Sequence, residues 1–217
     1  MSWVNHFIQR CVFRFIDKKW LTRKLYSNCI WEMNDNNIYL TFDDGPHNEL
    51  TLFVLSQLNE YNAKATFFCV GRMVETNRSI YEKIVQDGHA VGNHTYSHTN
   101  NLFLDTIRYF NDIDKAKKII DTKLFRPAFG QITRSQVTEI KKRFNLNTVM
   151  WSVEGNDWAH NITGDECYEK IIKNAKGGSI ILLHDNDFSE KTLRYVLPKL
   201  LAYFTEAGFK FKSIPSN

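Results

Sequence analysis

Cysteine is scarce in this chain, and its placement suggests neither a cross-link nor a cysteine-based metal site. The four residues Cys11, Cys29, Cys69 and Cys167 stand far apart, and none forms a Cys-x-x-Cys pair. Such spacing is typical neither of a zinc knot nor of a disulfide framework. We therefore expect free thiols that behave as small apolar residues, which suits a reducing compartment.

Long apolar runs and clusters of one charge are also missing. No window reaches the length of a membrane span, so we expect no transmembrane segment. The formal charge is +4 and the 28 Lys and Arg residues are scattered, so nucleic acid is not expected as a partner. With 217 residues, of which 43% are hydrophobic and 24% charged, the chain fits one globular domain with a sizeable core.

We see no secretory signal, because basic residues interrupt every apolar stretch near the N-terminus. The apolar residues of this segment recur instead at helical spacing: Val4, Ile8, Cys11 and Phe15. We interpret residues 1–36 as an amphipathic helix and lead-in that caps the core. Peripheral contact of this helix with a membrane surface is a less favoured alternative. Without an export signal a cytoplasmic location is the expectation, although the sequence leaves the location open.

What the chain does contain is a regular alternation of short β-rich runs and amphipathic helical stretches. The predicted strands are 38–43, 65–70, 89–93, 124–127, 147–153, 179–184 and 210–214. The predicted helices are 49–61, 75–87, 101–122, 133–144, 164–176 and 189–207. Pro198 falls inside the last helix and should kink or divide it.

This alternation predicts an α/β domain over residues 37–217, with a parallel sheet and right-handed crossovers. The pattern alone fits both a barrel and an open doubly wound sheet. Asp-Asp-Gly-Pro follows the first strand where a Gly-rich phosphate loop would stand, which weighs against a nucleotide-binding open sheet. In a barrel the chemistry lies at the C-terminal ends of the strands, where the candidate groups of this chain also lie.

Two adjacent aspartates, Asp43 and Asp44, end the first predicted strand just before Gly45-Pro46. Neighbouring carboxylates repel each other, and removing both from water is costly unless a positive group lies beside them. One aspartate would be enough to cap the turn, so the second needs another explanation. We expect Asp44 to bind a metal ion and Asp43 to act as the general base that takes a proton from the attacking water.

His94 and His98 are the natural partner ligands. They lie four residues apart, so one helical turn would aim both imidazoles the same way. Such a pair is weak evidence alone, but the upstream aspartates strengthen it. Two histidines and one carboxylate leave positions open for water and substrate, as catalytic zinc sites do. The predicted metal ligands are therefore Asp44, His94 and His98.

Three further residues could complete a catalytic site. His184 ends the most apolar predicted strand, where an imidazole could donate a proton to a departing amine. Arg126 could pair with Asp43 and fix its direction. Asp157 could pair with His184 and raise its pKa.

Five segments, taken in order, resemble the five motifs of the polysaccharide deacetylases, the NodB-homology group and family 4 of the carbohydrate esterases. They are Thr41-Phe42-Asp43-Asp44-Gly45-Pro46, His94-Thr95-Tyr96-Ser97-His98, Arg126-Pro127-Ala128-Phe129-Gly130, Asp157-Trp158 and Leu182-Leu183-His184. The resemblance covers roughly residues 37–214, and five motifs in a fixed order are highly specific.

The resemblance implies a single-domain, distorted (β/α) barrel of seven or eight strands. It also implies a divalent metal, most often Zn²⁺, with Co²⁺ or another divalent ion as an alternative. The roles expected above for the base, the ligands, the acid and their partners agree with the family's motifs. The family adds that the Phe129 backbone N–H helps to hold the oxyanion, and that Trp158 and Leu182 line the pocket for the acetyl methyl group.

The implied activity is removal of N-acetyl groups from N-acetylglucosamine units of an oligo- or polysaccharide such as chitin or peptidoglycan, with release of acetate. Three departures leave the substrate open: Ala128 and Phe129 replace proline and tyrosine, and Glu154 stands where Asp is common. An O-acetyl esterase acting on xylan and a small-molecule amidase remain alternatives. An inactive sugar-binding module is a less favoured one.

Overall fold

The computed structural model describes residues 19–100 and 105–216, and its strands belong to one curled sheet. The strands are β1 (Asn37–Asp43), β2 (Thr66–Cys69), β3 (Ala90–Asn93), β4 (Leu124–Phe125), β5 (Asn147–Thr148), β6 (Val153–Glu154), β7 (Ile180–His184) and β8 (Lys210–Phe211). Across the sheet they follow the order β5-β4-β3-β2-β1-β7-β6, and β8 pairs with the start of β1. Each of these pairs is parallel.

A short segment joins the two edges of this sheet. β5 and β6 stand at opposite ends of the strand order, yet only residues 149–152 separate them in the chain. Val149 N–H donates to Phe125 O at 2.8 Å, and Ser152 N–H donates to Ile180 O at 3.0 Å. The segment therefore binds strands from both halves of the sheet and curls it into an incomplete barrel, which confirms the distorted barrel that the family resemblance implied.

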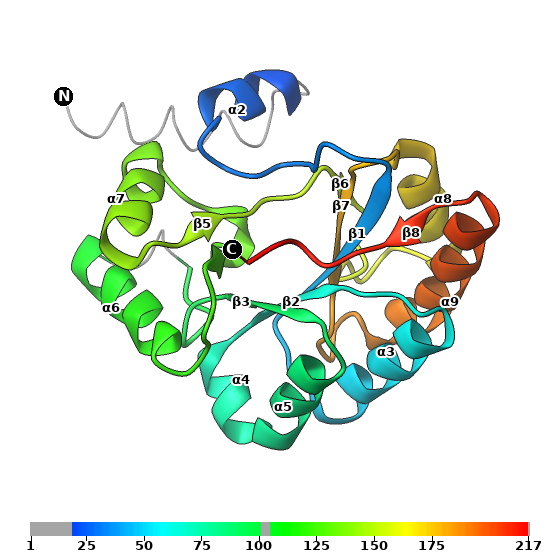
Figure 1. Cartoon of the computed structure of the whole chain (residues 1–217), viewed down its shortest axis with the longest axis horizontal. Coiled ribbons are helices and arrows are strands. Elements are labelled where there is room, and N and C mark those ends of the chain that lie inside the picture. The colour runs from blue at the N-terminus through cyan, green and yellow to red at the C-terminus, as the bar shows by residue number, and fades with distance from the viewer. Residues whose placement is uncertain (1–18, 101–104, 217) are drawn as a thin grey trace.

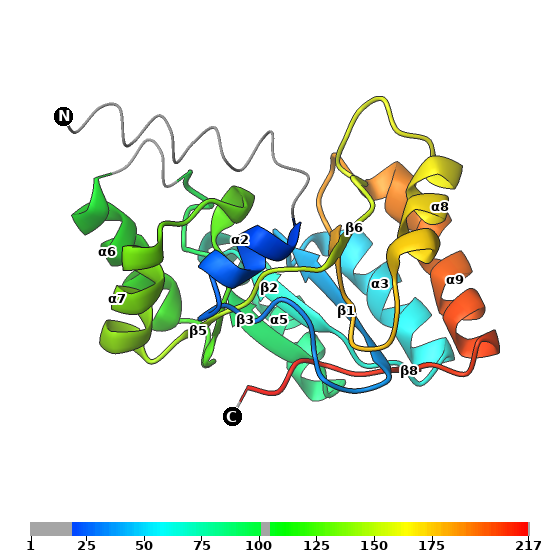
Figure 2. The ribbon, with the colours of Figure 1, turned by 90° about the horizontal axis from the view of Figure 1, so that it is seen from above.

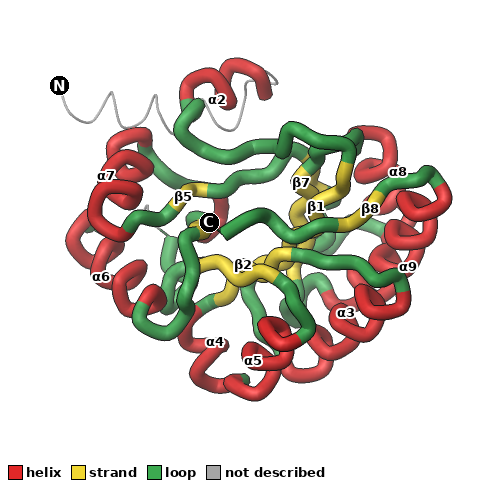
Figure 3. Tube along the Cα trace, in the orientation of Figure 1, coloured by secondary structure: helices red, strands yellow, loops and turns green. Residues whose placement is uncertain are grey.

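Helices surround the barrel on its outer side (Figures 1 and 3). They are α3 (Asn48–Glu60), α4 (Gly71–Thr76), α5 (Arg78–Gln86), α6 (Thr106–Lys117), α7 (Arg134–Phe144), α8 (Gly164–Asn174) and α9 (Glu190–Glu206), with α2 (Lys19–Leu25) before the first strand and a 3₁₀ turn, η1 (Ala128–Gly130), after β4. Turning the molecule by 90° leaves α6 and α7 on one side of the strands and α8 and α9 on the other (Figure 2). No helix in the described ranges is long and apolar enough to cross a membrane.

Alternation along β1 decides which side chains enter the barrel. Ile38, Leu40 and Phe42 belong to the larger apolar core between the sheet and the helices. Tyr39, Thr41 and Asp43 take the opposite face. Tyr39 packs there with Phe68, Leu124, Val149, Ile180 and Ile214. Asp43 thus points into the barrel at the C-terminal end of the strand.

The same rule applies to β7, which pairs with β1 residue by residue. Ile181 and Leu183 lie in the outer core, so Leu182 and His184 face inward. In this register His184 stands directly beside Asp43. The pairing of two neighbouring strands therefore brings two candidate catalytic groups, distant in sequence, to the same rim of the barrel.

Two predicted elements are divided in the structure. Residues 147–153, predicted as one strand, form β5 and β6 with the closing segment between them, because the chain there must cross from one sheet edge to the other. The predicted helix 75–87 is replaced by α4 and α5, which meet at Asn77. Asn77 has φ −120° and ψ 47°, outside the helical region, and its amide donates to Pro46 O at 2.9 Å.

Three further predictions concern the bounds and the continuity of helices. The predicted helix 101–122 corresponds to α6, and residues 101–104 lie outside the described ranges. Pro198 does not divide α9, which is one helix whose apolar face, including Val196 and Leu197, stays buried on both sides of the proline. The expected helix within residues 1–36 falls largely on residues 1–18, which are outside the described part of the chain.

The cysteine expectation is confirmed where the structure describes it. Cys29, Cys69 and Cys167 are free and buried. Burial raises the pKa of the Cys29 thiol to about 12, and the pKa of Cys167 to a similar value with help from the Asp157 charge. These thiols therefore behave as apolar side chains. Cys11 lies outside the described residues.

The start of α8 offers a test of how local sequence stabilises the helices. Thr163 Oγ1 accepts from Glu166 N–H at 3.1 Å, and Glu166 Oε2 accepts from Thr163 N–H at 2.8 Å, which is a complete capping box. Thr163→Ala should lower the free energy of unfolding by about 1 kcal/mol. Thr138→Ala, at an exposed position within α7, should change it by less than about 0.5 kcal/mol. Urea unfolding of both variants measures the difference; equal effects would contradict the capping role.

Candidate active site and metal centre

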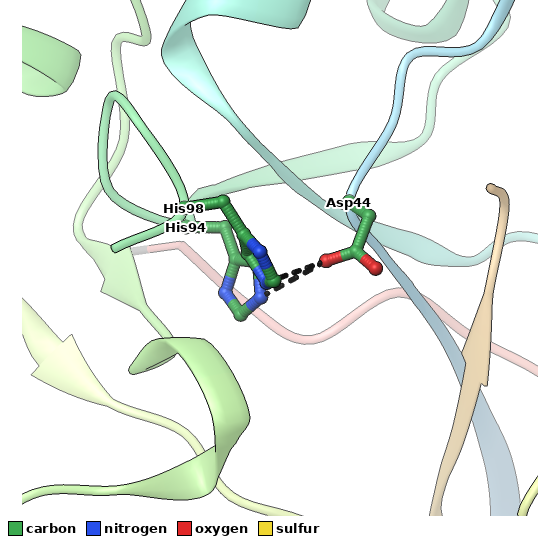
Figure 4. Close-up of side chains that lie close together, drawn as sticks. All are labelled: Asp44, His94 and His98. Atoms are coloured by element: carbon green, nitrogen blue, oxygen red, sulfur yellow. Dashed lines mark ion pairs between the residues drawn. The ribbon is translucent and has the colours of Figure 1, made fainter. Parts of the chain in front are cut away.

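Asp44, His94 and His98 converge at the C-terminal rim of the barrel (Figure 4). Asp44 Oδ1 lies 3.0 Å from His98 Nε2 and 3.4 Å from His94 Nε2. The three potential ligand atoms all lie within 4.8 Å of one another. Asp44 follows β1, and both histidines follow β3, two strands away across the sheet. The structure thus brings together the three residues that the sequence predicted as ligands.

The geometry and the chemistry of this trio fit a divalent metal ion. Two atoms bound tetrahedrally at about 2.0–2.1 Å from a zinc ion lie roughly 3.3 Å apart, close to the distances observed here. Asp44 Oδ1 is buried without a hydrogen-bond partner, a costly state that a cation would relieve. Two imidazole nitrogens and one carboxylate oxygen are a donor set of catalytic zinc sites.

The charges at this site shift the pKa values of Asp44 and His94. Burial alone would raise the pKa of Asp44, but the neighbouring imidazoles of His94 and His98 hold it well below the usual value. Burial alone would lower the pKa of His94, and the charges of Asp43 and Asp44 outweigh this and raise it. The site therefore favours a carboxylate beside positive charge, which is the charge that a metal ion would provide.

The tautomer of His94 follows from its second nitrogen. His94 Nδ1 lies 2.8 Å from the backbone oxygen of Arg126, and a carbonyl can only accept. In the neutral ring Nδ1 must then carry the proton, which leaves the lone pair of Nε2, the atom nearest Asp44, available for a metal ion. Because the imidazole is only 2% exposed, its orientation is fixed by the protein.

The loop that carries the two histidines does not form the helical turn that the sequence suggested. Residues 94–98 are irregular, and both Thr95 (φ 65°) and His98 (φ 54°) are left-handed. Asp112 on α6 accepts from the backbone N–H groups of Tyr96 and Ser97 at 3.0 and 3.1 Å. These tertiary bonds replace the helical ones, so the imidazoles converge by loop folding rather than by helical periodicity.

Left-handed residues other than glycine are concentrated at this site. Among the described residues, Asp44 (φ 85°), Thr95, His98 and Phe129 (φ 59°) all lie in or beside the ligand loops. Such conformations cost free energy and persist only where surrounding contacts enforce them. The two adjacent carboxylates approach the same His94 nitrogen but have different further partners, Arg126 beside Asp43 and His98 beside Asp44.

Asp43 pairs with a completely buried arginine. Arg126 Nη1 donates to Asp43 Oδ1 and to Thr41 Oγ1, both at 2.7 Å. The remaining guanidinium nitrogens donate to backbone oxygens of Val149 and Met150, at 3.2 and 2.9 Å. Burial lowers the pKa of Arg126, and Asp43 counteracts this. The pairing expected from the sequence is present, and Arg126 engages Asp43 Oδ1, while Asp43 Oδ2 lies 3.7 Å from His94 Nε2.

His184 is tied to Asp157 by two hydrogen bonds. Its Nδ1 lies 2.9 Å from Asp157 Oδ1, and its backbone N–H donates to Asp157 Oδ2 at 2.8 Å. Burial alone would lower the pKa of His184, but the charges of Asp157, Asp43 and Asp44 raise it to about 9. Nδ1 is engaged by the carboxylate, so Nε2 is the nitrogen available for proton transfer.

The three residues expected to contact substrate differ in exposure. Phe129 is 56% exposed, and its ring centroid lies 4.7 Å from that of His98. Trp158, which is 48% exposed, directly follows Asp157, and its indole N–H donates to Glu154 at 3.1 Å. Leu182 is buried and shares the inner face of β7 with His184. All three therefore lie on the segments that carry or contact the catalytic candidates.

Some supporting residues were not predicted from the sequence. Asn93, fully buried, accepts from Thr95 N–H at 2.9 Å and donates to Ile113 O at 3.0 Å. Glu154 accepts from the indole N–H groups of Trp151 and Trp158. Of these contacts only the one between Asn93 and Ile113 links two separate elements, β3 and α6, whereas the others lie within four residues of one another. Asn93 could have been suspected only because a polar residue ends a buried strand.

The His184–Asp157 pair predicts a specific titration in the metal-free protein. Asp157→Asn should move the pKa of His184 from about 9 down toward the ordinary value of 6.5. Because the folded pKa is the higher one, the ion pair stabilises fully below about pH 6.5 and loses this effect as pH rises through about 9. The stability difference between wild type and variant should therefore be largest below pH 6.5 and smallest above pH 9.

NMR titration of the histidine ring protons measures this shift, and unfolding at several pH values measures the stability. His89 is an internal control, since burial lowers its pKa to about 4 and it lies away from the pair. An unchanged His184 titration in the variant would show that Asp157 does not set its pKa.

Comparison with known proteins agrees with this geometry. The family model described as polysaccharide deacetylase matches residues 32–149. A peptidoglycan-N-acetylglucosamine deacetylase of Bacillus cereus is 34% identical over 193 residues, which cover 85% of this chain and 90% of that protein. A chitooligosaccharide deacetylase of Azorhizobium caulinodans is 34% identical over 207 residues, covering 84% of this chain and 94% of that protein.

A solved structure shares the whole architecture. The crystal structure of a peptidoglycan N-acetylglucosamine deacetylase in complex with 4-naphthalen-1-yl-N-oxidanyl-benzamide superposes with a TM-score of 0.82 at 31% identity. The match covers 93% of this chain and 96% of that one. With the family model, the relatives and the fold in agreement, this chain belongs to the polysaccharide deacetylase family.

Proposed function

We propose that this protein is a zinc-dependent hydrolase that removes N-acetyl groups from N-acetylglucosamine units of an oligo- or polysaccharide and releases acetate. One observation carries the proposal above all. A buried carboxylate, Asp43, lies beside a three-residue metal-binding cluster yet is held by Arg126, while an independent His184–Asp157 pair stands on the adjacent strand. Separate residues can therefore act as the metal ligands, as the base (Asp43) and as the acid (His184).

Asp44, His94 and His98 would hold the metal through one carboxylate oxygen and two Nε2 atoms. When bound, the metal acts as a Lewis acid that polarises the acetamide carbonyl and makes water more acidic. The family is metal-dependent, and zinc is favoured here because two imidazoles with one carboxylate suit its tetrahedral coordination.

Asp43 is proposed as the general base. Arg126 binds its Oδ1, while Oδ2 faces the site, 3.7 Å from His94 Nε2. As water attacks the carbonyl carbon, Asp43 takes one of its protons, and Arg126 holds the carboxylate in position. The charged hydrogen bond engages Oδ1, which leaves Oδ2 as the oxygen free to take the proton.

His184 is proposed as the general acid. With a pKa of about 9 it carries a proton at neutral pH, and Asp157 stabilises that charged form. When the carbon–nitrogen bond breaks, His184 protonates the leaving nitrogen and a free amine departs together with acetate. Because Asp43 and His184 are register partners on β1 and β7, the base and the acid stand side by side on the same rim.

The substrate-facing residues are assigned by their place on this rim. The Phe129 backbone N–H would donate to the oxyanion, the kind of fixed donor that usually supplies a large part of catalysis. Trp158 and Leu182 would line the pocket for the acetyl methyl group. The substrate class is supported by the relatives described for peptidoglycan N-acetylglucosamine and for chitooligosaccharides.

Replacing the base separates metal binding from catalysis. Asp43→Asn should lower kcat/KM by at least ~100-fold, because the amide cannot take the proton. Zinc content should remain near that of the wild type, because Asp43 is not among the three ligands. Asp114→Asn, at an exposed ion pair on α6, is the matched control and should retain full activity. If Asp43→Asn keeps a kcat/KM near that of the wild type, Asp43 is not the general base.

Metal dependence and substrate class can be tested together. Treatment with a chelator should abolish acetate release, and added Zn²⁺ should restore it. The restored enzyme should release acetate faster from N-acetylglucosamine oligomers than from acetylated xylan. Faster release from xylan would favour an O-acetyl esterase. No release from either substrate by metal-loaded protein would favour an inactive sugar-binding module.

A further inference from the structure

Three consecutive residues after His184 each hold one residue of the loop that follows β1. Asp185 accepts from the backbone N–H of Gly45 at 3.0 Å. Asn186 donates to Asp44 Oδ2 at 2.6 Å. Asp187 Oδ1 lies 2.7 Å from His47 Nε2. The loop after β7 therefore contacts the loop after β1, which carries the proposed ligand Asp44, through three successive residues.

Asp185 fixes the backbone of this loop. Its side chain is buried, and it accepts from Thr51 Oγ1 in the first turn of α3 as well as from Gly45. A Cβ at Gly45 would lie 2.2 Å from Asp185 Oδ2, so only glycine permits this approach. The Asp185 backbone N–H donates to Asp43 O at 3.1 Å, which joins the two loops at their start.

Asn186 fixes the side chain of Asp44. Its Oδ1 accepts from the backbone N–H of Ser189 at 3.0 Å. Since that N–H can only donate, the oxygen of the amide must face Ser189, and the NH₂ must face Asp44. Ser189 is fully buried at the start of α9, so the amide is anchored on a rigid element.

The two oxygens of Asp44 consequently have different surroundings. Oδ2 accepts from Asn186, whereas Oδ1 faces His94 and His98 without a hydrogen-bond partner of its own. Rotation of the carboxylate would break the Asn186 bond. The amide therefore selects a single oxygen for the metal and fixes the direction of its lone pairs.

We propose that Asn186 is a positioning residue that makes Asp44 a preorganised, single-oxygen metal ligand, with Asp185 holding the backbone beneath it. The inference rests on the proposed metal site and names the part of the chain that shapes it. The Asn186 side chain bonds to Asp44 and to Ser189, and to neither Asp43 nor the His184 imidazole. Its loss should weaken metal binding before it affects any step of the reaction.

The test is the affinity of the metal-free protein for Zn²⁺, measured by competition with a chromophoric chelator. Asn186→Leu keeps the approximate side-chain volume and removes the donor, and should weaken Zn²⁺ binding about 10- to 100-fold. Asn174→Leu is the matched control: that amide bonds to Lys170 O on the exposed end of α8, and its loss should leave the affinity unchanged.

A second readout separates positioning from a general loss of structure. Protein loaded with Co²⁺ should show a changed visible spectrum in Asn186→Leu, because a released carboxylate alters the coordination geometry, and an unchanged one in Asn174→Leu. Asn186→Ser keeps a polar group beside Ser189 but cannot reach Asp44. It should weaken binding similarly, and it decides the question if the leucine variant does not fold.

The outcomes are distinct. Wild-type Zn²⁺ affinity and an unchanged Co²⁺ spectrum in the Asn186 variants would overturn the role of Asn186 and leave the metal site intact. A wild-type protein that binds no Zn²⁺ would overturn the metal site itself, and with it the proposed function. Weakened binding confined to the Asn186 variants supports the proposal.

Discussion

The buried ion pair between Arg126 and Asp43 is the interaction on which the rest of the site depends. Asp43 ends β1 and Asp44 follows it, and two adjacent, largely buried carboxylates can both stay ionised only beside positive charge. Arg126, with no exposed surface, supplies that charge to Asp43 from inside the barrel. Removing one partner of such a buried pair costs about 3–5 kcal/mol, since the other charge is left uncompensated.

Arg126 also links the site to the closure of the sheet. Its guanidinium, carried by the residue after β4, reaches β1 through Asp43 and Thr41. It also binds the carbonyl groups of Val149 and Met150 in the segment that joins the two sheet edges. The donors of this planar, rigid group are thus divided between β1 and the segment that joins the sheet edges. The position of Asp43, the proposed base, and the closure of the sheet therefore depend on the same guanidinium group.

The chemistry is divided among neighbouring strand ends. β1 contributes Asp43 and Asp44, β3 leads into the two histidines, and β7 ends in His184. Because all these strands are parallel, their C-terminal ends meet on one rim. Loops then refine the positions: Asp112 and Asn93 shape the histidine loop, and the segment after His184 holds the loop after β1. The strands bring the groups near, and the loops set their direction.

The sequence by itself determined the alternation of strands and helices, the placement of each candidate group at a strand end, and the expected pairings of Arg126 with Asp43 and of Asp157 with His184. These follow from local periodicity and from charge, which a sequence displays directly. It did not determine the course of residues 94–98, the division of 147–153, or the contact of Asn186 with Asp44. Only the tertiary structure decided those, because each depends on hydrogen bonds between segments far apart in the chain, which outweigh local propensity.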